Sequence, residues 1–131
     1  MDLIRKHKIK SLAKDRRGQI VNILEEKKFA DIANILVIDS KKGTVRANHY
    51  HKKDSHYMYL IKGKLRYSVK NMNKKGAQLK SVIVRAGEMV YTPPMVAHVV
   101  EFLEDSLFLA LATRSRKQKA YENDTVRIGL V

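Results

Sequence analysis

Apolar and polar residues alternate over short segments along most of this chain. In residues 44–51 the odd positions from Val45 to His51 are apolar or histidine, whereas Arg46 begins the polar even positions. A period of two is typical of a β-strand with one face directed inward. Segments with strand character, by alternation or as short apolar runs, are 34–40, 44–51, 56–63, 64–71, 79–85, 89–92, 97–103 and 106–113.

Short polar turns separate these segments at nearly regular intervals, as in "KKG" (41–43), "KKDS" (52–55) and "EDS" (104–106). About eight short strands with such turns predict an all-β sandwich or barrel. The apolar run in 34–40 predicts a buried strand, and only 14–29 is ambiguous between a strand with a turn and a short helix. Because no linker or repeat is visible, we expect residues 1–131 to form a single domain.

The composition excludes some kinds of site. The chain has 131 residues, of which 44% are hydrophobic, and it contains no cysteine. A disulfide framework or a thiolate metal site is therefore excluded, and any metal must bind histidine, carboxylate or water. The charged start "MDLIRKHKIK" does not resemble a signal peptide, and no apolar run is long enough for a membrane helix. We expect a cytoplasmic protein with no membrane partner.

The charge is strongly positive. There are 27 basic and 13 acidic residues, giving a net charge of +14. This balance attracts anions, including phosphorylated small molecules, although a solvated lysine-rich surface would look the same. Because no nucleic-acid-binding pattern accompanies the charge, a nucleic-acid partner is not favoured. The segment "TRSRKQK" (113–119) is expected to belong to a solvated basic tail that begins near 113.

Three of the five histidines lie within "GTVRANHYHKKDSHYMYLIKG" (43–63). His49 and His51 share one strand face, and His56 begins the next strand on the side of Met58 and Leu60. His98 likewise shares a face with Val100 and Phe102. Several unpaired imidazoles in one apolar interior would be costly, and a shared metal ion would satisfy them. His7, in the charged leader, is not expected to take part.

The spacing of these histidines resembles the two motifs of the cupins, a family of small β-barrels. The first motif, G-x5-H-x-H-x4-E-x6-G, is matched at every spacing, with His56 in place of the glutamate. The second, G-x5-P-x-G-x2-H-x3-N, is matched at its first glycine, proline and histidine, whereas Met95 and Phe102 replace the second glycine and the asparagine. The matching positions are Gly43, His49, His51, His56 and Gly63, then Gly87, Pro93 and His98.

This resemblance implies a cupin-type double-stranded β-helix, or jelly roll, with a metal held by His49, His51, His56 and His98. We expect one divalent transition metal per chain, with zinc, nickel or iron(II) favoured, because an all-imidazole shell is neutral and comparatively soft. The alternative is a metal-free cupin in which the histidines serve acid–base or structural roles.

A second resemblance covers more of the chain. The segments "DRRGQIVNILEE", "RANHYHKK" and "AHVVEFLEDSLFLALATRS" are similar to cupins of sugar-nucleotide metabolism, including keto-sugar isomerases and epimerases and the cupin domain of capsule-sugar reductases. It implies that His49 and His51 act as a catalytic base or proton shuttle. It also implies a phosphate contact for Arg46, although strand alternation places that side chain outward. Tyr67 alternates inward and is a further catalytic candidate, or a core residue.

The favoured function is therefore isomerisation or epimerisation of a keto sugar or nucleotide sugar, with an enolate stabilised while a base moves a proton. Two alternatives stay open. One is a small metal-dependent oxygenase or lyase acting on an organic acid or diketone, and the other is a non-catalytic binding or sensing cupin. We also expect a homodimer formed through the apolar "NILVI" strand and the N-terminal segment.

Overall fold

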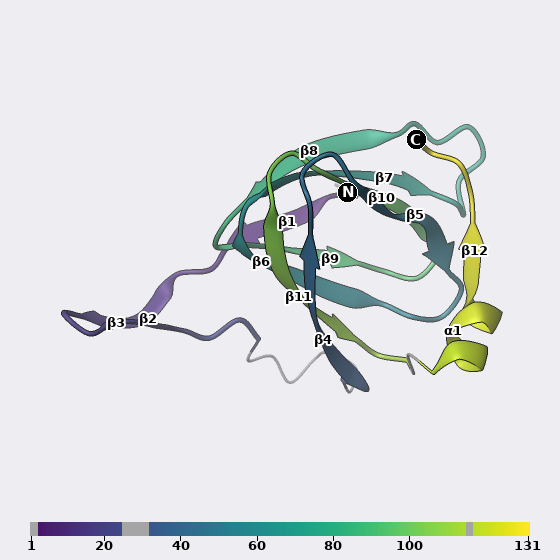
Figure 1. The fold of residues 1–131 in the computed structure, drawn as a ribbon. Coiled ribbons are helices and arrows are strands. Elements are labelled where there is room, and N and C mark those ends of the chain that lie inside the picture. Colours follow the sequence, from purple (N-terminus) through teal and green to yellow (C-terminus); the bar gives the residue numbers. More distant parts are fainter. Residues whose placement is uncertain (1–2, 25–31, 115–116) are drawn as a thin grey trace.

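Two five-stranded antiparallel sheets face each other and enclose the core of the protein (Figure 1). This architecture comes from a computed structural model, which describes residues 3–24, 32–114 and 117–131. The first sheet has the order β1-β9-β6-β11-β4 and the second the order β12-β5-β10-β7-β8. A separate hairpin, β2–β3, projects from this body (Figure 1).

The strand boundaries follow the predicted segments closely. The first sheet consists of β1 (Arg5–Lys8), β9 (Glu88–Thr92), β6 (His56–Lys62), β11 (Ser106–Ala112) and β4 (Asn34–Ser40). The second consists of β12 (Thr125–Arg127), β5 (Val45–His51), β10 (Val96–Phe102), β7 (Lys64–Asn71) and β8 (Lys80–Arg85). The hairpin strands are β2 (Ser11–Asp15) and β3 (Gly18–Val21), and one helix, α1 (Gln118–Asp124), precedes β12.

The core lies between the inner faces of the two sheets. Leu60, Tyr67 and Phe102 are fully buried there, and they come from strands in both sheets. Because side chains alternate across a strand, Tyr57 on β6 points to the other face, where it packs in a second cluster with Met89 and Leu111. The predicted all-β architecture is confirmed, and its alternation follows the sequence pattern.

β1 and β12 were not anticipated, whereas the hairpin β2–β3 agrees with the strand-and-turn alternative for 14–29. The charged leader contributes β1, which pairs with β9, and part of the ambiguous segment 14–29 forms the hairpin β2–β3. Residues 25–29 of that segment lie outside the described residues. The expectation of a solvated tail from about 113 is wrong for residues 118–127. These residues form α1 and β12, and β12 pairs with β5. Residues 115–116 of "TRSRKQK" are not described.

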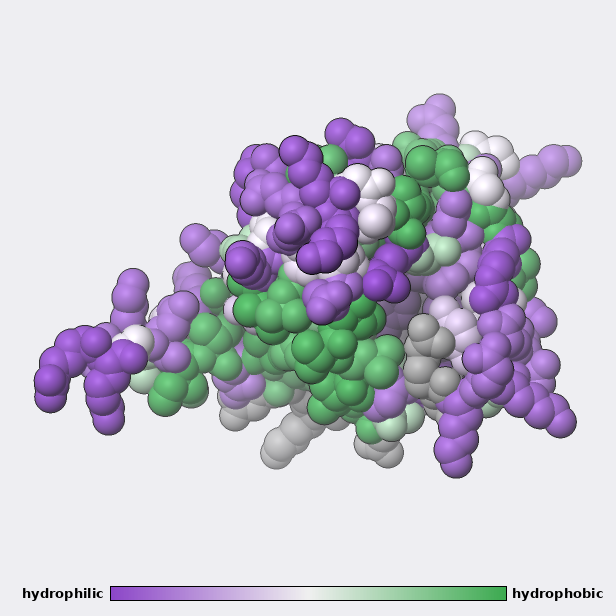
Figure 2. Space-filling view, in the orientation of Figure 1, coloured by the Kyte–Doolittle hydropathy of each residue, from purple (hydrophilic) through white to green (hydrophobic). Residues whose placement is uncertain are grey.

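The prediction that residues 34–40 form a buried strand is wrong in one respect. β4 is the last strand of its sheet, and its alternating burial shows that only one of its faces meets the core. Ile35 and Val37 on its other face are 63% and 69% exposed. Figure 2 shows this hydrophobic area over β4 and β11. The hairpin adds two more exposed apolar side chains, Leu12 and Ile20. The apolar run in the sequence thus reflects one buried face and one exposed apolar face.

No helix among the described residues has the length and apolar character needed to cross a membrane.

Gly63 joins β6 to β7 in a conformation that few other residues tolerate. Its φ of 106° lies in the left-handed region, and a methyl group at its Cα would lie 2.7 Å from the carbonyl oxygen of Asp105 and would also collide with Ser106. The backbone of the neighbouring turn therefore leaves no room for a side chain here.

We predict that Gly63→Ala lowers the free energy of unfolding by about 2–5 kcal/mol, because backbone strain of about 1–2 kcal/mol adds to overpacking of about 1–3 kcal/mol. Gly43→Ala is the matched control, since Gly43 has a φ of 86° and no atom within 4 Å of the added carbon. Urea unfolding of both variants measures the difference. Equal losses would show that the close approach at Gly63 costs nothing.

Candidate functional site

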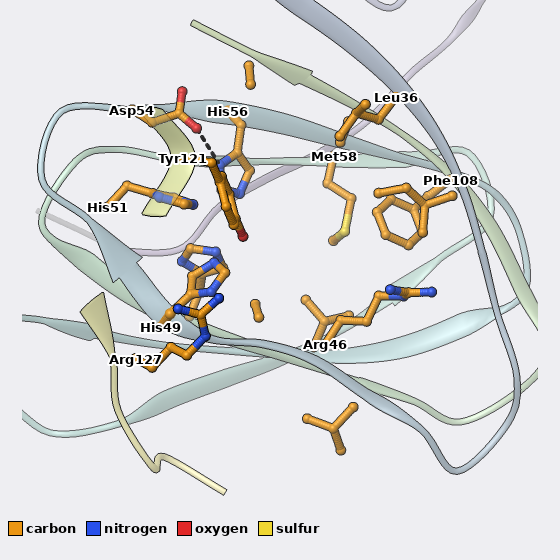
Figure 3. A pocket seen from close by; sticks show the side chains of 17 residues that line it. Leu36, Arg46, His49, His51, Asp54, His56, Met58, Phe108, Tyr121 and Arg127 are labelled. Atoms are coloured by element: carbon orange, nitrogen blue, oxygen red, sulfur yellow. Dashed lines mark ion pairs between the residues drawn. The ribbon is translucent and has the colours of Figure 1, made fainter. Parts of the chain in front are cut away.

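A cavity of about 340 Å³ opens between the two sheets and has two chemically different sides (Figure 3). One side is polar and carries histidines together with Asp54 and Tyr121. The other is apolar and carries Leu36, Met58 and Phe108. Three strands (β5, β6 and β10), the turn between β5 and β6, and the C-terminal segment supply the polar groups, so this arrangement exists only in the folded chain.

Four histidine rings converge on the polar side, as their strand positions predict. β5 provides His49 and His51, and β10 provides His98, which lies directly opposite His49 in the strand register. β6 provides His56 from the facing sheet. Ring centroids are 4.6 Å apart for His49–His51, 4.8 Å for His49–His98, 4.9 Å for His56–His98 and 5.8 Å for both His51–His56 and His51–His98.

Neighbouring groups fix the protonation of the ring nitrogens of His98. Its Nδ1 lies 3.1 Å from the carbonyl oxygen of Val96. A carbonyl oxygen only accepts hydrogen bonds, so Nδ1 must carry the proton and Nε2 must carry the lone pair. Nε2 is the ring nitrogen that a metal ion or an acidic proton would then meet.

His51 is oriented in the same manner by the C-terminal segment. Its Nδ1 lies 3.1 Å from Oγ1 of Thr125, and that hydroxyl donates its single proton to the carbonyl oxygen of Tyr121 at 2.6 Å. The hydroxyl oxygen therefore accepts from Nδ1–H of His51, which leaves the lone pair on Nε2. The carboxylate of Asp124 lies 3.7 Å from the same Nδ1, and its negative charge also favours the proton on that nitrogen.

Asp54 is a buried carboxylate that the sequence analysis did not single out. It lies in the turn between β5 and β6 and is only 7% exposed. Its Oδ1 accepts hydrogen bonds from the backbone N–H groups of Thr113 and Arg114 and from the Thr113 hydroxyl, at 3.0–3.1 Å. Its Oδ2 faces Nδ1 of His56 at 4.0 Å, the contact marked by the dashed line in Figure 3.

The electrostatic environment favours the neutral forms of His98 and His56. Burial lowers the pKa of His98 to about 4. Burial also lowers the pKa of His56 well below its ordinary value, and the charges of the other three histidines act in the same direction. The pKa of Asp54 is raised, first by burial, against the opposing effect of His51. Neutral imidazoles with lone pairs directed inward are what a metal ion requires of its ligands.

A bulge in β5 turns Arg46 into the cavity, which corrects the expectation that it faces outward. The register moves from His98–His49 to Val99–Ala47, so Asn48 is an extra residue in β5. Beyond this bulge, Arg46 lies opposite Val100, a core residue, and opposite residues share a face of the sheet. The Arg46 guanidinium donates to Oγ of Ser40 at 2.6 Å.

The C-terminal backbone holds the bulge. Ala47 and Asn48 have φ values of 67° and 62°, in the left-handed region that non-glycine residues seldom adopt. The side-chain oxygen of Asn48 accepts from the N–H of Leu130 at 2.7 Å, and its amide nitrogen donates to Val131 at 2.9 Å. The alternating sequence gave no indication of this irregularity, because it depends on contacts with residues more than eighty positions away.

Two further residues reach the cavity from the C-terminal segment. The Tyr121 ring lies 5.5 Å from that of His51 and 6.3 Å from that of His49. Arg127, on β12, lines the cavity and forms a two-point ion pair with Glu122 at 2.8 and 2.9 Å. Only the pairing of β12 with β5 brings these residues here, so their sequence spacing carried no signal.

Tyr67 does not take the catalytic position that the sequence left open. It is 1% exposed and belongs to the core cluster. Its hydroxyl is hydrogen-bonded to Oγ1 of Thr92 at 2.6 Å, and burial raises its pKa to about 12. Of the two readings in the sequence analysis, this geometry favours the core residue. His7 lies exposed on β1, away from the cavity lining.

The donor set fits a divalent transition-metal ion. Donor atoms of His49, His51 and His98 lie within 4.8 Å of one another, and those of His51, Asp54 and His56 form a second such group. Imidazole and carboxylate suit zinc, nickel and iron(II), and histidine ligands generally have a fixed partner on the other nitrogen, as His51 and His98 do.

Comparison with known proteins agrees with this architecture. A family described as "Polysaccharide biosynthesis C-terminal domain" matches residues 13–126. No curated protein sequence matches the chain. Solved structures that share the fold include a 3,4-ketoisomerase from Helicobacter canadensis, with a TM-score of 0.78 and 19% identity over 95% of this chain and 90% of that one.

Two other structures extend the comparison. A 3,4-ketoisomerase from Thermoanaerobacterium thermosaccharolyticum, in complex with TDP-4-keto-6-deoxyglucose, has a TM-score of 0.76 and 20% identity, covering 97% of this chain and 88% of that one. A 3,5-epimerase from Legionella pneumophila, in complex with dTDP-4-keto-L-rhamnose, has a TM-score of 0.82 and 16% identity, covering 100% and 75%. The predicted cupin-type jelly roll, and its resemblance to sugar-nucleotide cupins, are confirmed.

We predict that the metal-free protein loses stability as the pH falls from about 6.5 to about 4. In that window the unfolded chain, with an ordinary histidine pKa of about 6.5, binds a proton that folded His98 does not bind. The shift of His98 alone corresponds to about 3 kcal/mol, and His56 acts in the same direction.

Urea unfolding in the presence of a chelator, repeated across this pH range, measures the effect. His98→Gln should show a shallower fall than the parent, whatever its stability at neutral pH. Parallel curves for parent and variant would contradict the assignment to His98.

Proposed function

We propose that this chain, which belongs to the family of polysaccharide biosynthesis C-terminal domains, is an enzyme that isomerises or epimerises a nucleotide-linked keto sugar. The observation that carries the proposal is the cluster of four histidines beside Tyr121, inside a cavity whose other wall is apolar. Proton-transfer groups and a site for an anionic oxygen therefore lie in one enclosed space. The fold is shared with ketoisomerases and epimerases that act on such sugars.

The shape and charge of the cavity support a sugar ring as the part that enters. A volume of about 340 Å³ is near the lower end of the range of about 300–1,000 Å³ typical of ligand pockets. The nucleotide portion would then lie at the mouth. Arg46 lines the cavity and supplies positive charge for a diphosphate, whereas Arg127 would have to exchange its ion pair with Glu122 for such a contact. The apolar wall at Met58 and Phe108 would contact the deoxy carbon of a 6-deoxy sugar.

His49, His51, His56 and His98 would hold one divalent ion, with zinc, nickel or iron(II) favoured by the nitrogen-rich donor set. When bound, such an ion supplies a Lewis acid that polarises a carbonyl group and stabilises an enolate. The chain itself would contribute the orientation of His51 through Thr125 and Asp124, and that of His98 through Val96.

The reaction requires a proton to leave the carbon next to the keto group and to return elsewhere. Removal of that proton leaves an enolate. If the proton returns at the former carbonyl carbon, and the hydroxyl proton moves as well, the product is an isomer. If the proton instead returns to the carbon that lost it, but on the opposite face, the product is an epimer. The phenol of Tyr121 is placed to exchange protons with the sugar, since its ring lies over the histidine cluster. In the metal-free alternative, His49 or His51 would serve as the base.

We also propose that two chains associate through the exposed apolar face of β4. Ile35 and Val37 are exposed there, and the β2–β3 hairpin carries Leu12 and Ile20 in exposed positions. An isolated two-stranded hairpin is only marginally stable in water. Packing of the hairpin against a second copy would cover both apolar areas, as closed two-fold assembly allows.

We predict that the protein catalyses deuterium incorporation into TDP-4-keto-6-deoxyglucose in D₂O, detected by NMR and mass spectrometry at a carbon next to the keto group. Tyr121→Phe should slow the exchange by at least about 100-fold, in the range typical of a lost acid–base group. Tyr59→Phe is the control, because Tyr59 packs in the cluster outside the barrel.

Metal removal completes this experiment. Chelation should abolish the exchange, and zinc, nickel or iron(II) should restore it. Exchange that survives chelation in a protein without bound metal would assign the acid–base role to His49 and His51. Absence of exchange in the metal-loaded parent would overturn the proposed reaction, and oxygen consumption with an organic acid or diketone would then favour the oxygenase alternative.

We predict a mass of twice 15.1 kDa by light scattering. Val37→Lys should shift the protein toward the monomer, since it places a charge on the apolar face of β4. Leu79→Lys, at a 44% exposed position in the loop before β8, should leave the mass unchanged. A parent protein with the mass of one chain would exclude the dimer.

A further inference from the structure

We propose that Asp54 is a ligand of the ion and restores the carboxylate that the first cupin motif has at the position of His56. The shell would then combine imidazoles with one carboxylate, rather than histidines alone. This inference rests on the metal centre in the proposed function. It concerns a residue that lies outside the motif spacing and is brought to the cluster by the turn between β5 and β6.

One pair of donor atoms is already close enough for one ion. The donor atoms of His51, Asp54 and His56 as a group lie within 4.8 Å of one another, so a small approach of the side chains would complete the site. Bonds from zinc to nitrogen or oxygen are about 2.0–2.2 Å long, so two ligands of one ion can be at most about 4.4 Å apart. Oδ2 of Asp54 and Nδ1 of His56 are 4.0 Å apart, beyond hydrogen-bonding distance but within the span of one ion.

The carboxylate is held with one oxygen anchored and the other directed toward the cluster. Oδ1 accepts three hydrogen bonds, two from Thr113 and one from Arg114, at the end of β11. Oδ2 faces His56, and Asp54 lines the same cavity (Figure 3). A ligating carboxylate characteristically has hydrogen bonds on its other oxygen, and these reduce its freedom before the ion binds.

The turn that carries Asp54 is itself fixed from the other side. The backbone N–H groups of Lys53 and Asp54 donate to the two carboxylate oxygens of Asp124 at 2.8 and 3.0 Å. Asp124 also lies near Nδ1 of His51. The backbone and the side chain of Asp54 are therefore both held by residues far along the chain, which places its carboxylate among the histidines.

The presence of a carboxylate changes the expected metal preference. Four neutral imidazoles leave both charges of a divalent ion uncompensated, whereas Asp54 offsets one of them. Carboxylate oxygen is a harder ligand than imidazole, so manganese(II) and iron(II) become more competitive with zinc than an all-histidine shell would allow. With Asp54 as a ligand, the metal preference is harder than the one expected from an all-imidazole shell with His56 in place of the motif glutamate.

Asp54→Asn separates a ligand from a structural residue. The asparagine side chain keeps a carbonyl oxygen for Thr113 and Arg114 but removes the negative charge from the side facing His56. Asp105→Asn is the matched control, because Asp105 also accepts a backbone N–H, that of Lys42, but lies in an exposed turn. The double variant Asp54→Asn with His56→Glu moves the carboxylate to the motif position.

Cobalt(II) titration, followed by visible absorption, tests the assignment. We expect Asp54→Asn to weaken cobalt(II) binding at least tenfold, to change the ligand-field spectrum and to lower the affinity for manganese(II) more than that for zinc. We expect Asp105→Asn to match the parent and the double variant to recover most of the lost affinity. Infrared difference spectra of the parent labelled with ¹³C-aspartate should show a shift of a carboxylate band on metal binding, which tests the proposal even if Asp54→Asn does not fold.

The outcomes distinguish the two proposals. A parent that binds no cobalt(II), zinc or manganese(II) overturns the metal centre itself. A parent that binds metal, with Asp54→Asn showing the same affinity and spectrum, overturns the role of Asp54 and leaves the histidine site standing. Weaker binding with an unchanged spectrum and no shift of the aspartate band also overturns ligation, because Asp54 would then only support its neighbours.

Discussion

The pairing of β5 with its two neighbours is the interaction on which the site depends. On one side β10 brings His98 opposite His49, and on the other β12 brings Thr125 opposite His51. A one-residue slip of either pairing would turn the side chains to the other face of the sheet. The bulge at Asn48 lets β5 meet this register and still direct Arg46 into the cavity.

The C-terminal segment is an integral part of this arrangement. α1 has no buried residues, so its contribution is not to the core. Its Tyr121 faces the histidines, Asp124 fixes the turn that carries Asp54, and Thr125 sets the protonation of His51. The segment that looks like a basic tail in the sequence therefore positions groups from three different parts of the chain.

Burial of several titratable groups in one place has a cost that the fold manages through hydrogen bonding. His98, His51 and Asp54 each have a defined partner on one side, from Val96, Thr125 and Thr113 respectively. The opposite side of each group is thereby directed toward the shared space. An arrangement of this kind directs lone pairs into one space, where they can serve as donors to a metal ion.

The sequence by itself determined the eight strands from β4 to β11, most of their inward faces and the convergence of the four histidines. These follow from local alternation and motif spacing, because a period of two places His49 and His51 on one face whatever the rest of the chain does. The same local rule failed at Arg46, where a bulge held by Asn48 and the C-terminal backbone reverses the parity. Tertiary structure alone decided the positions of Asp54, Tyr121 and Arg127, since each reaches the cavity through hydrogen bonds or strand pairing between residues far apart in sequence.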